Sequence, residues 1–280
     1  MGLFSGLEAF GLKNENRKIY EDPEEPKKAE AVKQEKKEIP IKEEDILFPK
    51  SHTCPICDKS FKSLAVRAGK VRNIGQDDDL RPKYNCVDPI KYDAIVCPYC
   101  GYGAVTRYFQ YVMPVQSKKL RAEIKSNFRG IEHSLDKYSY EEAMLNYKIV
   151  LMCDVVGGVP ASRKAYTCLK MAWLIRGWLE SEGEHLPEDK KKNLEANYKE
   201  CIQNAYQGYI KAFSSETFPL SGMDEMTVSY LVAQLAFEVD DYPVSLRMLA
   251  NILGNKNVSV RIKEKAIDLK NQIREKVNKK

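Results

Sequence analysis

Apolar and polar positions divide the chain of 280 residues into stretches of different character. The first stretch is short and apolar, the second is almost entirely polar, the third alternates short apolar runs with turns, and the fourth has helical periodicity. Their bounds are residues 1–12, 13–50, 51–112 and 113–280. Each stretch predicts a different kind of structure.

The polar stretch, residues 13–50, contains ten basic and eleven acidic residues. It cannot bury enough apolar surface to offset its ordering entropy, so we expect a disordered, charged linker. Residues 1–12 precede it as a short amphipathic segment, with Leu3, Leu7 and Phe10 at helical spacing. Helices that lie on membranes normally carry basic residues on their polar face, and this segment has none. We therefore expect it to dock on a protein, and a membrane surface is the weaker alternative.

The third stretch has β-branched and aromatic runs between Gly, Pro and Asp turns, which is typical of a small β domain. Residues 61–72 and 92–96 are the clearest candidate strands. The fourth stretch predicts six or seven helices, because turn-forming residues interrupt its periodicity at four places. These breaks lie at residues 157–160, 183–187, 218–222 and 254–257.

Three of the expected helices repeat one arrangement: a small residue, a large one four positions later, and an apolar one after three more. The sets are Ala143, Tyr147, Val150; Ala205, Tyr209, Ala212; and Ser245, Leu249, Ile252. The arrangement resembles the second helix of a tetratricopeptide repeat, but the repeats of that family recur every ~34 residues, and these sets lie 62 and 40 residues apart. We expect irregularly stacked helical hairpins, and an ordinary helical bundle is the alternative.

Two cysteine pairs carry the strongest chemical signal in the sequence. Cys54 and Cys57 form one Cys-x-x-Cys knuckle, and Cys97 and Cys100 form the other, with Gly101 directly after it. Two intervening residues let a tight turn aim both sulfurs at one point, and four thiolates complete a tetrahedral zinc shell. A redox-active Cys-x-x-Cys would need only one pair. The sequence therefore predicts one closed, structural zinc site.

The other possible metal ligands are expected to take no part. His52 and Cys86 lie near the knuckles, but the four cysteines already fill the shell. Cys153, Cys168 and Cys201 fall in helical patterns and are expected to be small core residues. The predicted fold class is therefore α+β, mostly α, with a small zinc-ribbon-like β domain followed by tetratricopeptide-like helical hairpins.

Composition favours a cytoplasmic protein. There is no apolar run of about 18 residues that would span a membrane, and the N-terminus lacks the features of a secretory signal. Because half of the eight cysteines form metal-binding pairs, the thiols are expected to be reduced.

Enzyme signals are weak. The chain has three histidines and no His-Glu-x-x-His, no phosphate-binding Gly-x4-Gly-Lys loop and no Gly-x-Ser-x-Gly turn. Asp77, Asp78 and Asp79 could be imagined as a cation site, but a charged loop between strands is the commoner explanation of such a run. We expect no catalytic activity.

A nucleic-acid interface is the alternative to an interaction protein. Five basic residues follow the first knuckle without an acidic residue between them, and the candidate contacts are Lys62, Arg67, Lys70 and Arg72, with Lys59 beside them. Aromatic residues around the second knuckle could stack on bases, although packing against the helices is the commoner role. These are Tyr99, Tyr102, Tyr108, Phe109 and Tyr111. The net charge of +5 is spread along the chain, which argues against a dedicated binder.

Four separate stretches resemble, in order, an uncharacterised bacterial family known as domain of unknown function 2225. They are CPICDKSFKSLAVRAGKVR, DLRPKYNCVDPIKYDAIVCPYCGYGAVTRYF, AYTCLKMAWLIRG and FPLSGMDEMTVSYLVAQLAFEVDDYPVSL. The resemblance covers roughly residues 50–255. It implies a zinc-ribbon-like part followed by tetratricopeptide-like helices in a cytosolic bacterial protein, with the four knuckle cysteines as zinc ligands and Cys86 outside the pattern. It implies no activity.

These observations favour a non-catalytic zinc-binding adaptor whose helical domain binds a protein or peptide partner. The alternative is a nucleic-acid-binding regulator that uses the basic hairpin of the zinc ribbon.

Overall fold

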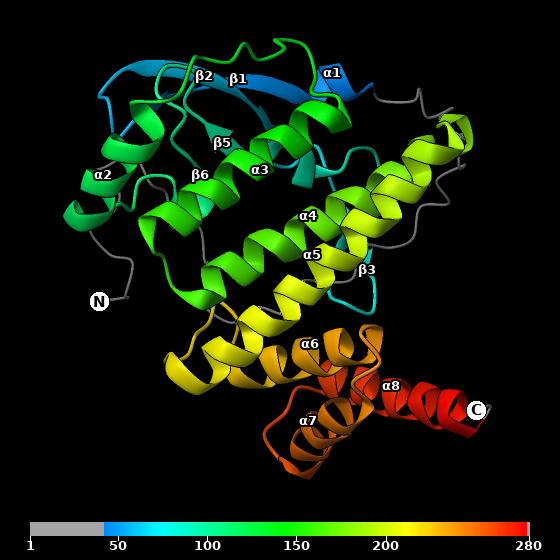
Figure 1. Ribbon diagram of the computed structural model, residues 1–280. Helices are drawn as coiled ribbons and strands as arrows, with labels where there is room; N and C mark the ends of the chain where they lie inside the picture. The colour runs from blue at the N-terminus through cyan, green and yellow to red at the C-terminus, as the bar shows by residue number, and fades with distance from the viewer. Residues whose placement is uncertain (1–41, 279–280) are drawn as a thin grey trace, which may run out of the picture. The chain divides into compact units, whose positions relative to one another are not determined.

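The computed structural model describes residues 42–278 (Figure 1). It is 59% helical and has a few small antiparallel strand pairs in its N-terminal part, followed by helices. The α+β, mostly α fold class is therefore confirmed. The predictions for residues 1–12 and 13–41 lie outside the described residues.

Within residues 42–278, the strands form three separate antiparallel hairpins. They are β1 (Leu47–Thr53) with β2 (Ser60–Val66), β3 (Asn73–Gln76) with β4 (Pro82–Tyr84), and β5 (Ala94–Val96) with β6 (Gly103–Val105). The first and third hairpins each enclose one cysteine pair in their turn. The β3–β4 hairpin lies between them in the sequence and carries the Asp77–Asp79 segment at its tip.

Short helical elements connect these hairpins to one another and to the long helices. They are α1 (Glu43–Ile46), η2 (Pro89–Tyr92), η3 (Thr106–Tyr108), α2 (Pro114–Leu120), the π-helical η4 (Arg121–Lys125) and η5 (Gly183–His185). The capping of η2 is local, since the Asp88 carboxylate accepts a hydrogen bond from the Ile90 amide at 2.9 Å.

The expected end of the disordered linker at residue 50 is wrong. Residues 43–50 form α1 and the first half of β1, and both Ile46 and Leu47 are buried in a small apolar cluster with Leu64 and Tyr138. The Glu43 carboxylate also accepts hydrogen bonds from the Lys91 ammonium and the Tyr92 hydroxyl of η2. Pairing with β2, which a composition-based argument cannot detect, orders the end of this charged stretch.

Six long helices follow in the described part of the chain, and their ends agree with the four predicted breaks. They are α3 (Tyr140–Gly157), α4 (Ala161–Glu182), α5 (Glu188–Ser215), α6 (Glu225–Glu238), α7 (Tyr242–Gly254) and α8 (Val260–Asn278). A fifth break, between α6 and α7, contains neither Gly nor Pro. There the Asp241 carboxylate caps α7 by accepting a hydrogen bond from the Val244 amide. None of the described helices is long and apolar enough to cross a membrane.

The repeated small–large–apolar sets lie on α3, α5 and α7, and all nine of their residues are at most 1% exposed. The pattern therefore identified the buried stripe of these helices correctly. Helices α4 and α5 pack along each other, as do α6 and α7 (Figure 1). Gly208 of α5 allows the closest approach, because a Cβ atom there would lie 2.8 Å from the Cβ of Ala165 on α4.

The predicted boundary at residue 112 does not separate two domains. The described residues, 42–278, belong to one compact unit, and its largest apolar cluster joins Ile90, Val96 and Val105 to residues of α3–α6. Two-stranded hairpins cannot support a core of their own. The hairpins of this protein therefore share the core of the helices.

Candidate metal centre

The two cysteine pairs occupy equivalent turns at the ends of two hairpins. Cys54 and Cys57 lie between β1 and β2, and Cys97 and Cys100 lie between β5 and β6. In each turn the amide of the residue after the second cysteine donates to the carbonyl of the first, at 2.9 Å for Asp58 and 3.0 Å for Gly101. The hairpins therefore present the two sulfur pairs in the same local geometry.

The four sulfur atoms converge from two hairpins that are distant in sequence. All four Sγ atoms lie within 4.8 Å of one another. The Cys54–Cys100 sulfur distance is 3.6 Å, and the Cys57–Cys97 distance is 3.7 Å. A tetrahedron with metal–sulfur bonds of ~2.3 Å has sulfur–sulfur edges of about 3.8 Å. The four cysteines could therefore hold one metal ion, and their spacing fits it.

The protonation of the cluster points to the same chemistry. Hydrogen bonding with Cys100 holds the pKa of the Cys97 thiol well below its usual range. The pKa of the Cys100 thiol is raised in turn, and its contact with the Cys54 sulfur is the largest cause. Four crowded thiols thus cannot all ionise by themselves, whereas a bound cation stabilises four thiolates at once.

An apolar shell encloses the cysteines. Three of the four are buried, and the surrounding side chains include Ile56, Phe61, Tyr102 and Phe109. Tyr102 also donates a hydrogen bond from its hydroxyl to the Phe109 carbonyl at 3.0 Å. The packing role expected for the aromatic residues thus holds for Tyr102 and Phe109, while Tyr99 and Tyr111 are exposed.

The residues expected to take no part lie apart from the sulfur cluster. The His52 ring contacts the Ser63 hydroxyl at 3.0 Å and stacks on Phe61. Cys86 contacts the side chain of Asn85. Among residues 42–278, the four knuckle cysteines are the one group of close metal-ligating side chains.

Cys153 has a role that the sequence did not reveal. It is buried on α3, as expected of a small core residue, and so are Cys168 and Cys201 on α4 and α5. Its sulfur also accepts a hydrogen bond from the Gly103 amide at 3.3 Å and donates to the Gly101 carbonyl at 3.4 Å. Helix α3 is therefore hydrogen-bonded through Cys153 to the backbone that directly follows the second knuckle.

A family model described as an uncharacterised protein conserved in bacteria, DUF2225, matches residues 47–277. The chain belongs to this family. A search of curated proteins and a search of solved structures found no match. The family match begins at the first residue of β1 and includes both knuckles and all of the long helices apart from the last residue of α8.

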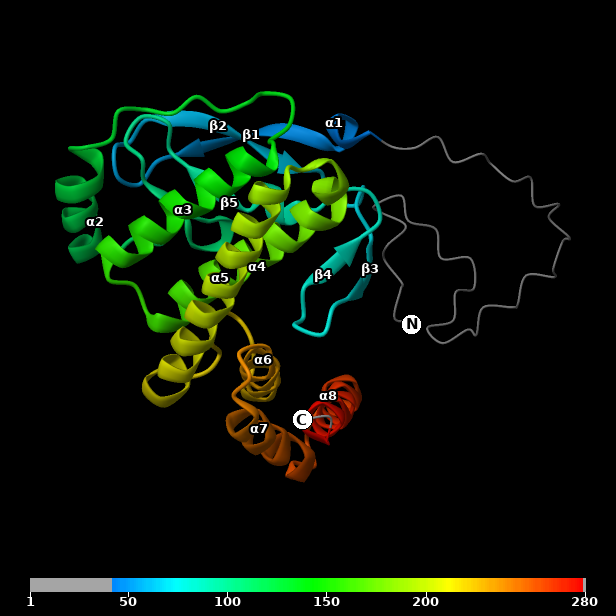
Figure 2. The same ribbon diagram turned by 45° about the vertical axis from the view of Figure 1, so that its right-hand side comes forward.

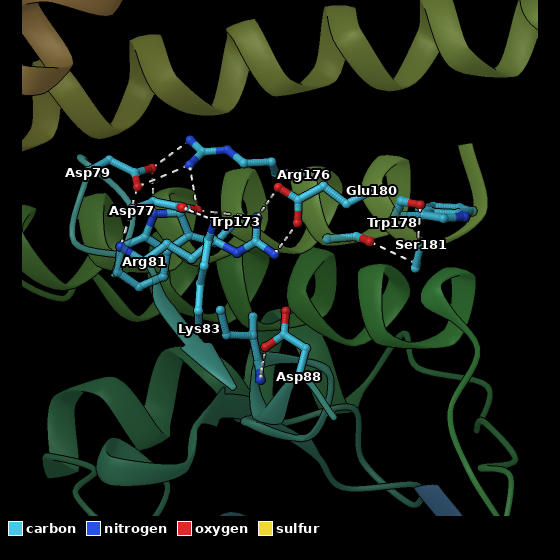
Figure 3. A network of polar contacts seen from close by, with 12 residues as sticks. Asp77, Asp79, Arg81, Lys83, Asp88, Trp173, Arg176, Trp178, Glu180 and Ser181 are labelled. Atoms are coloured by element: carbon cyan, nitrogen blue, oxygen red, sulfur yellow. Dashed lines mark hydrogen bonds and ion pairs between the residues drawn. The ribbon is translucent and has the colours of Figure 1, made fainter. Parts of the chain in front are cut away.

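A second concentration of polar groups joins the tip of the β3–β4 hairpin to α4 (Figure 3). Asp79 is 1% exposed, and its carboxylate accepts hydrogen bonds from Trp173 Nε1 at 2.8 Å and from Arg176 Nη2 at 2.6 Å. Arg176 also donates to the Tyr198 hydroxyl on α5, which in turn donates to Glu238 on α6. The Asp77–Asp79 segment does connect two strands, and Asp79 anchors it to the helices.

The same hairpin makes a second, bidentate contact. Arg81 donates from both terminal nitrogens to the Glu180 carboxylate on α4, at 3.0 and 2.7 Å. Lys83 pairs with Asp77 at 2.7 Å. The contacts of Lys83 with Asp77 and of Trp173 and Arg176 with Asp79 occupy carboxylates that a cation site at Asp77–Asp79 would need, so the structure lends that alternative no support.

The candidate nucleic-acid contacts are all on the surface. Lys62 lies on β2, and Arg67, Lys70 and Arg72 lie in the segment between β2 and β3. All four are exposed, and none pairs with an acidic residue in the described part of the chain. Lys59 lies over the exposed Tyr99 ring, 4.8 Å from its centroid.

Proposed function

We propose that this protein is a non-catalytic adaptor that contains one structural zinc ion and binds a protein or peptide partner through its helices. The observation that supports this proposal most directly is the closed donor set. Four cysteine sulfurs within 4.8 Å of one another fill a tetrahedral shell and leave no coordination position for a substrate.

Zinc is the metal that suits this site best. Tetrahedral sites with four thiolates hold zinc or iron, and zinc has no redox chemistry that a purely structural role would have to suppress. The ion would replace four thiol protons and hold the β1–β2 and β5–β6 turns together. Because its ligands must stay reduced, the proposal includes a cytoplasmic location.

The partner-binding role is supported by the arrangement around the centre. The second knuckle is hydrogen-bonded to α3 through Cys153. The metal would therefore hold the β1–β2 and β5–β6 hairpins together beside α3. Exposed apolar side chains on the long helices, such as Met152 and Val155 of α3, are the kind of surface that protein partners cover.

The proposal is tested by affinity purification of the tagged protein under gentle conditions, with and without nuclease. We expect a defined protein partner that survives nuclease treatment. A matched variant carries Lys62→Glu, Arg67→Glu, Lys70→Glu and Arg72→Glu, all at exposed positions, and should retain that partner. If no protein partner is recovered with either chain, the adaptor proposal fails.

A nucleic-acid-binding regulator is the second candidate, favoured by four exposed basic residues that pair with no acidic residue among residues 42–278. Binding of this kind weakens steeply with salt, because each phosphate contact releases counterions. The charge-reversed variant should then lose RNA or DNA binding that the unaltered chain shows at low salt. Absence of such binding in the unaltered chain would eliminate this candidate.

A further inference from the structure

The tip of the β3–β4 hairpin contacts α4, α6 and α8, and in Figure 2 it points toward α6 and α8. The two strands are largely exposed, whereas the tip, Asp77–Arg81, contains the buried residues Asp79 and Arg81. The hairpin is therefore held mainly by its tip.

Two of the helices that receive the tip, α4 and α8, each present a basic residue to its acidic side chains. On α4, Arg176 binds Asp79 through two hydrogen bonds, at 3.1 and 2.6 Å, and lies 3.3 Å from Asp77. On α8, Lys265 donates to the Asp77 carbonyl at 3.1 Å and lies 3.8 Å from the Asp78 carboxylate. Each of the three acidic residues of the tip thus contacts a basic residue of a helix.

Leu80 supplies the apolar part of the same contact. Its side chain packs both against the main core cluster and against the cluster formed by α6, α7 and α8. Its backbone has φ +67°, a left-handed conformation that is uncommon for leucine. The contact with the helices and the hydrogen bond from the Leu80 amide to the Asp77 carbonyl hold this conformation.

Behind the hairpin there is a hollow of about 610 Å³, lined on one side by β4 and on the other by the end of α4. Arg81, Lys83, Tyr84, Glu180 and Glu182 are among its lining residues. The strands therefore do not pack closely on α4. Since a two-stranded hairpin has little stability of its own, release of the tip would free the whole hairpin.

We propose that this surface of α4, α6 and α8 is the peptide-binding surface of the adaptor, and that residues Asp77–Leu80 of the tip are its resident ligand. The proposal rests on the proposed function and specifies the partner's chemistry. The partner presents an acidic segment followed directly by a leucine, and it binds by replacing the tip. The tip is thus an autoinhibitory contact, because a tethered ligand acts at an effective concentration of about millimolar.

The test uses a fluorescent peptide with the sequence of residues 73–84, NIGQDDDLRPKY, and fluorescence anisotropy. The full chain is compared with a double variant, Asp79→Asn with Leu80→Gly, whose tip is weakened. Glycine suits the left-handed backbone at position 80, and asparagine can still accept a hydrogen bond from Arg176, so the hairpin turn and the fold should persist. Circular dichroism and metal content verify this.

We expect the double variant to bind the peptide at least about ten-fold more tightly than the unaltered chain, because its own tip no longer competes. A control peptide with the same two substitutions should not bind. Adding Lys265→Glu on α8 to the double variant should weaken binding of the first peptide.

Equal or absent binding of the peptide by both folded chains would overturn the proposal. Hydrogen exchange gives an independent readout that does not depend on the variants. The Leu80 and Asp77 amides of the unaltered chain should exchange by local opening, faster than the amides of central α4. Exchange of these amides only through global unfolding would also overturn it. A protein partner recovered by affinity purification would stand in either case, so the adaptor proposal can survive this failure.

Discussion

The residue that follows each cysteine pair shows how one backbone requirement is met by two different residues. Asp58 and Gly101 both have positive φ, +61° and +72°. A Cβ atom at Gly101 would lie 2.5 Å from the ring of Phe128, whereas Asp58 is exposed. The conformation alone is thus compatible with aspartate, and it is the packing against Phe128 that requires glycine at the second knuckle.

Removal of one ligand should release the metal. We expect Cys97→Ser to lose the zinc ion that the unaltered chain binds in a ratio of about one per chain, and to unfold the two knuckles, because a structural metal site forms only when all of its ligands are present. Cys86→Ser is the matched control, since Cys86 lies outside the sulfur cluster. Metal analysis and thermal unfolding measure both effects. Retention of metal by Cys97→Ser would contradict the ligand assignment.

A second residue-scale prediction concerns pH. Asp154 is fully buried on α3, 2.9 Å from Arg163 Nε, and accepts a hydrogen bond from Thr167. Burial raises its pKa from 3.8 to about 6. Between about pH 4 and pH 6, the folded chain therefore holds a proton that the unfolded chain releases, and the stability contributed by this group falls as the pH rises.

The stability difference between the unaltered chain and Asp154→Asn isolates this group, because the other titrating groups are common to both. We expect the free energy of unfolding of the unaltered chain, relative to that of Asp154→Asn, to fall by on the order of 2–3 kcal/mol between pH 4 and pH 6.5. Urea unfolding at several pH values measures it. A constant difference, or one that grows with pH, would show that the pKa of Asp154 is not raised.

At the scale of elements, capping and turn residues define the helices. Ser139 and Glu142 form a capping box at the start of α3, and Gly158 ends that helix in a left-handed conformation. Local signals of this kind explain why four of the five breaks between long helices could be predicted. The fifth has neither Gly nor Pro between the two helices, and its local signals are the capping Asp241 and Pro243 in the first turn of α7.

The contact between α4 and α5 allows a test in which packing and helix propensity oppose each other. Alanine is a better helix former than glycine by about 1 kcal/mol. At position 208, however, its methyl group would lie 2.8 Å from the Ala165 Cβ and 3.3 Å from the Ala165 Cα. We expect Gly208→Ala to destabilise the protein by about 1–3 kcal/mol, because the two helices must separate.

Gly254→Ala is the control without a packing conflict, because Gly254 is also a helical glycine, at the last position of α7, and nothing lies within 4 Å of its added methyl group. It should be neutral or slightly stabilising. Urea unfolding measures both variants. A stabilised Gly208→Ala would mean that α4 and α5 do not approach as closely as the structure indicates.

At the scale of the whole molecule, the hairpins and the helices depend on each other. The Tyr147 hydroxyl of α3 donates to the Ile90 carbonyl of η2 at 2.9 Å, and the buried Lys170 of α4 pairs with Asp93 at 2.7 Å. Without the hairpins, these buried groups of the helices would lose their partners, which is costly.

A fragment of residues 113–280 should therefore not fold independently. We expect it to have reduced helicity, non-cooperative unfolding and exposed apolar surface that binds a hydrophobic dye, whereas residues 42–280 should unfold cooperatively. Circular dichroism and thermal unfolding distinguish the two. Cooperative unfolding of the shorter fragment with full helicity would restore the domain boundary predicted at residue 112.

The sequence by itself determined the features that depend on local spacing. Two residues between cysteines, three between Ala143 and Tyr147, and a glycine after a helix all act within one or two turns of chain. The cysteine pairs, the buried stripes and most helix ends were predictable for this reason.

Only the tertiary structure decided which distant segments share a surface. Asp79 lies 94 residues before Trp173 in sequence, yet the two are hydrogen-bonded. Neither residue has a neighbour in sequence that indicates this contact. Burial of the Asp79 carboxylate depends on the charge and hydrogen bonds of the Arg176 guanidinium and on a hairpin that places its tip beside α4. Such contacts arise from the packing of the whole chain, which local spacing does not encode.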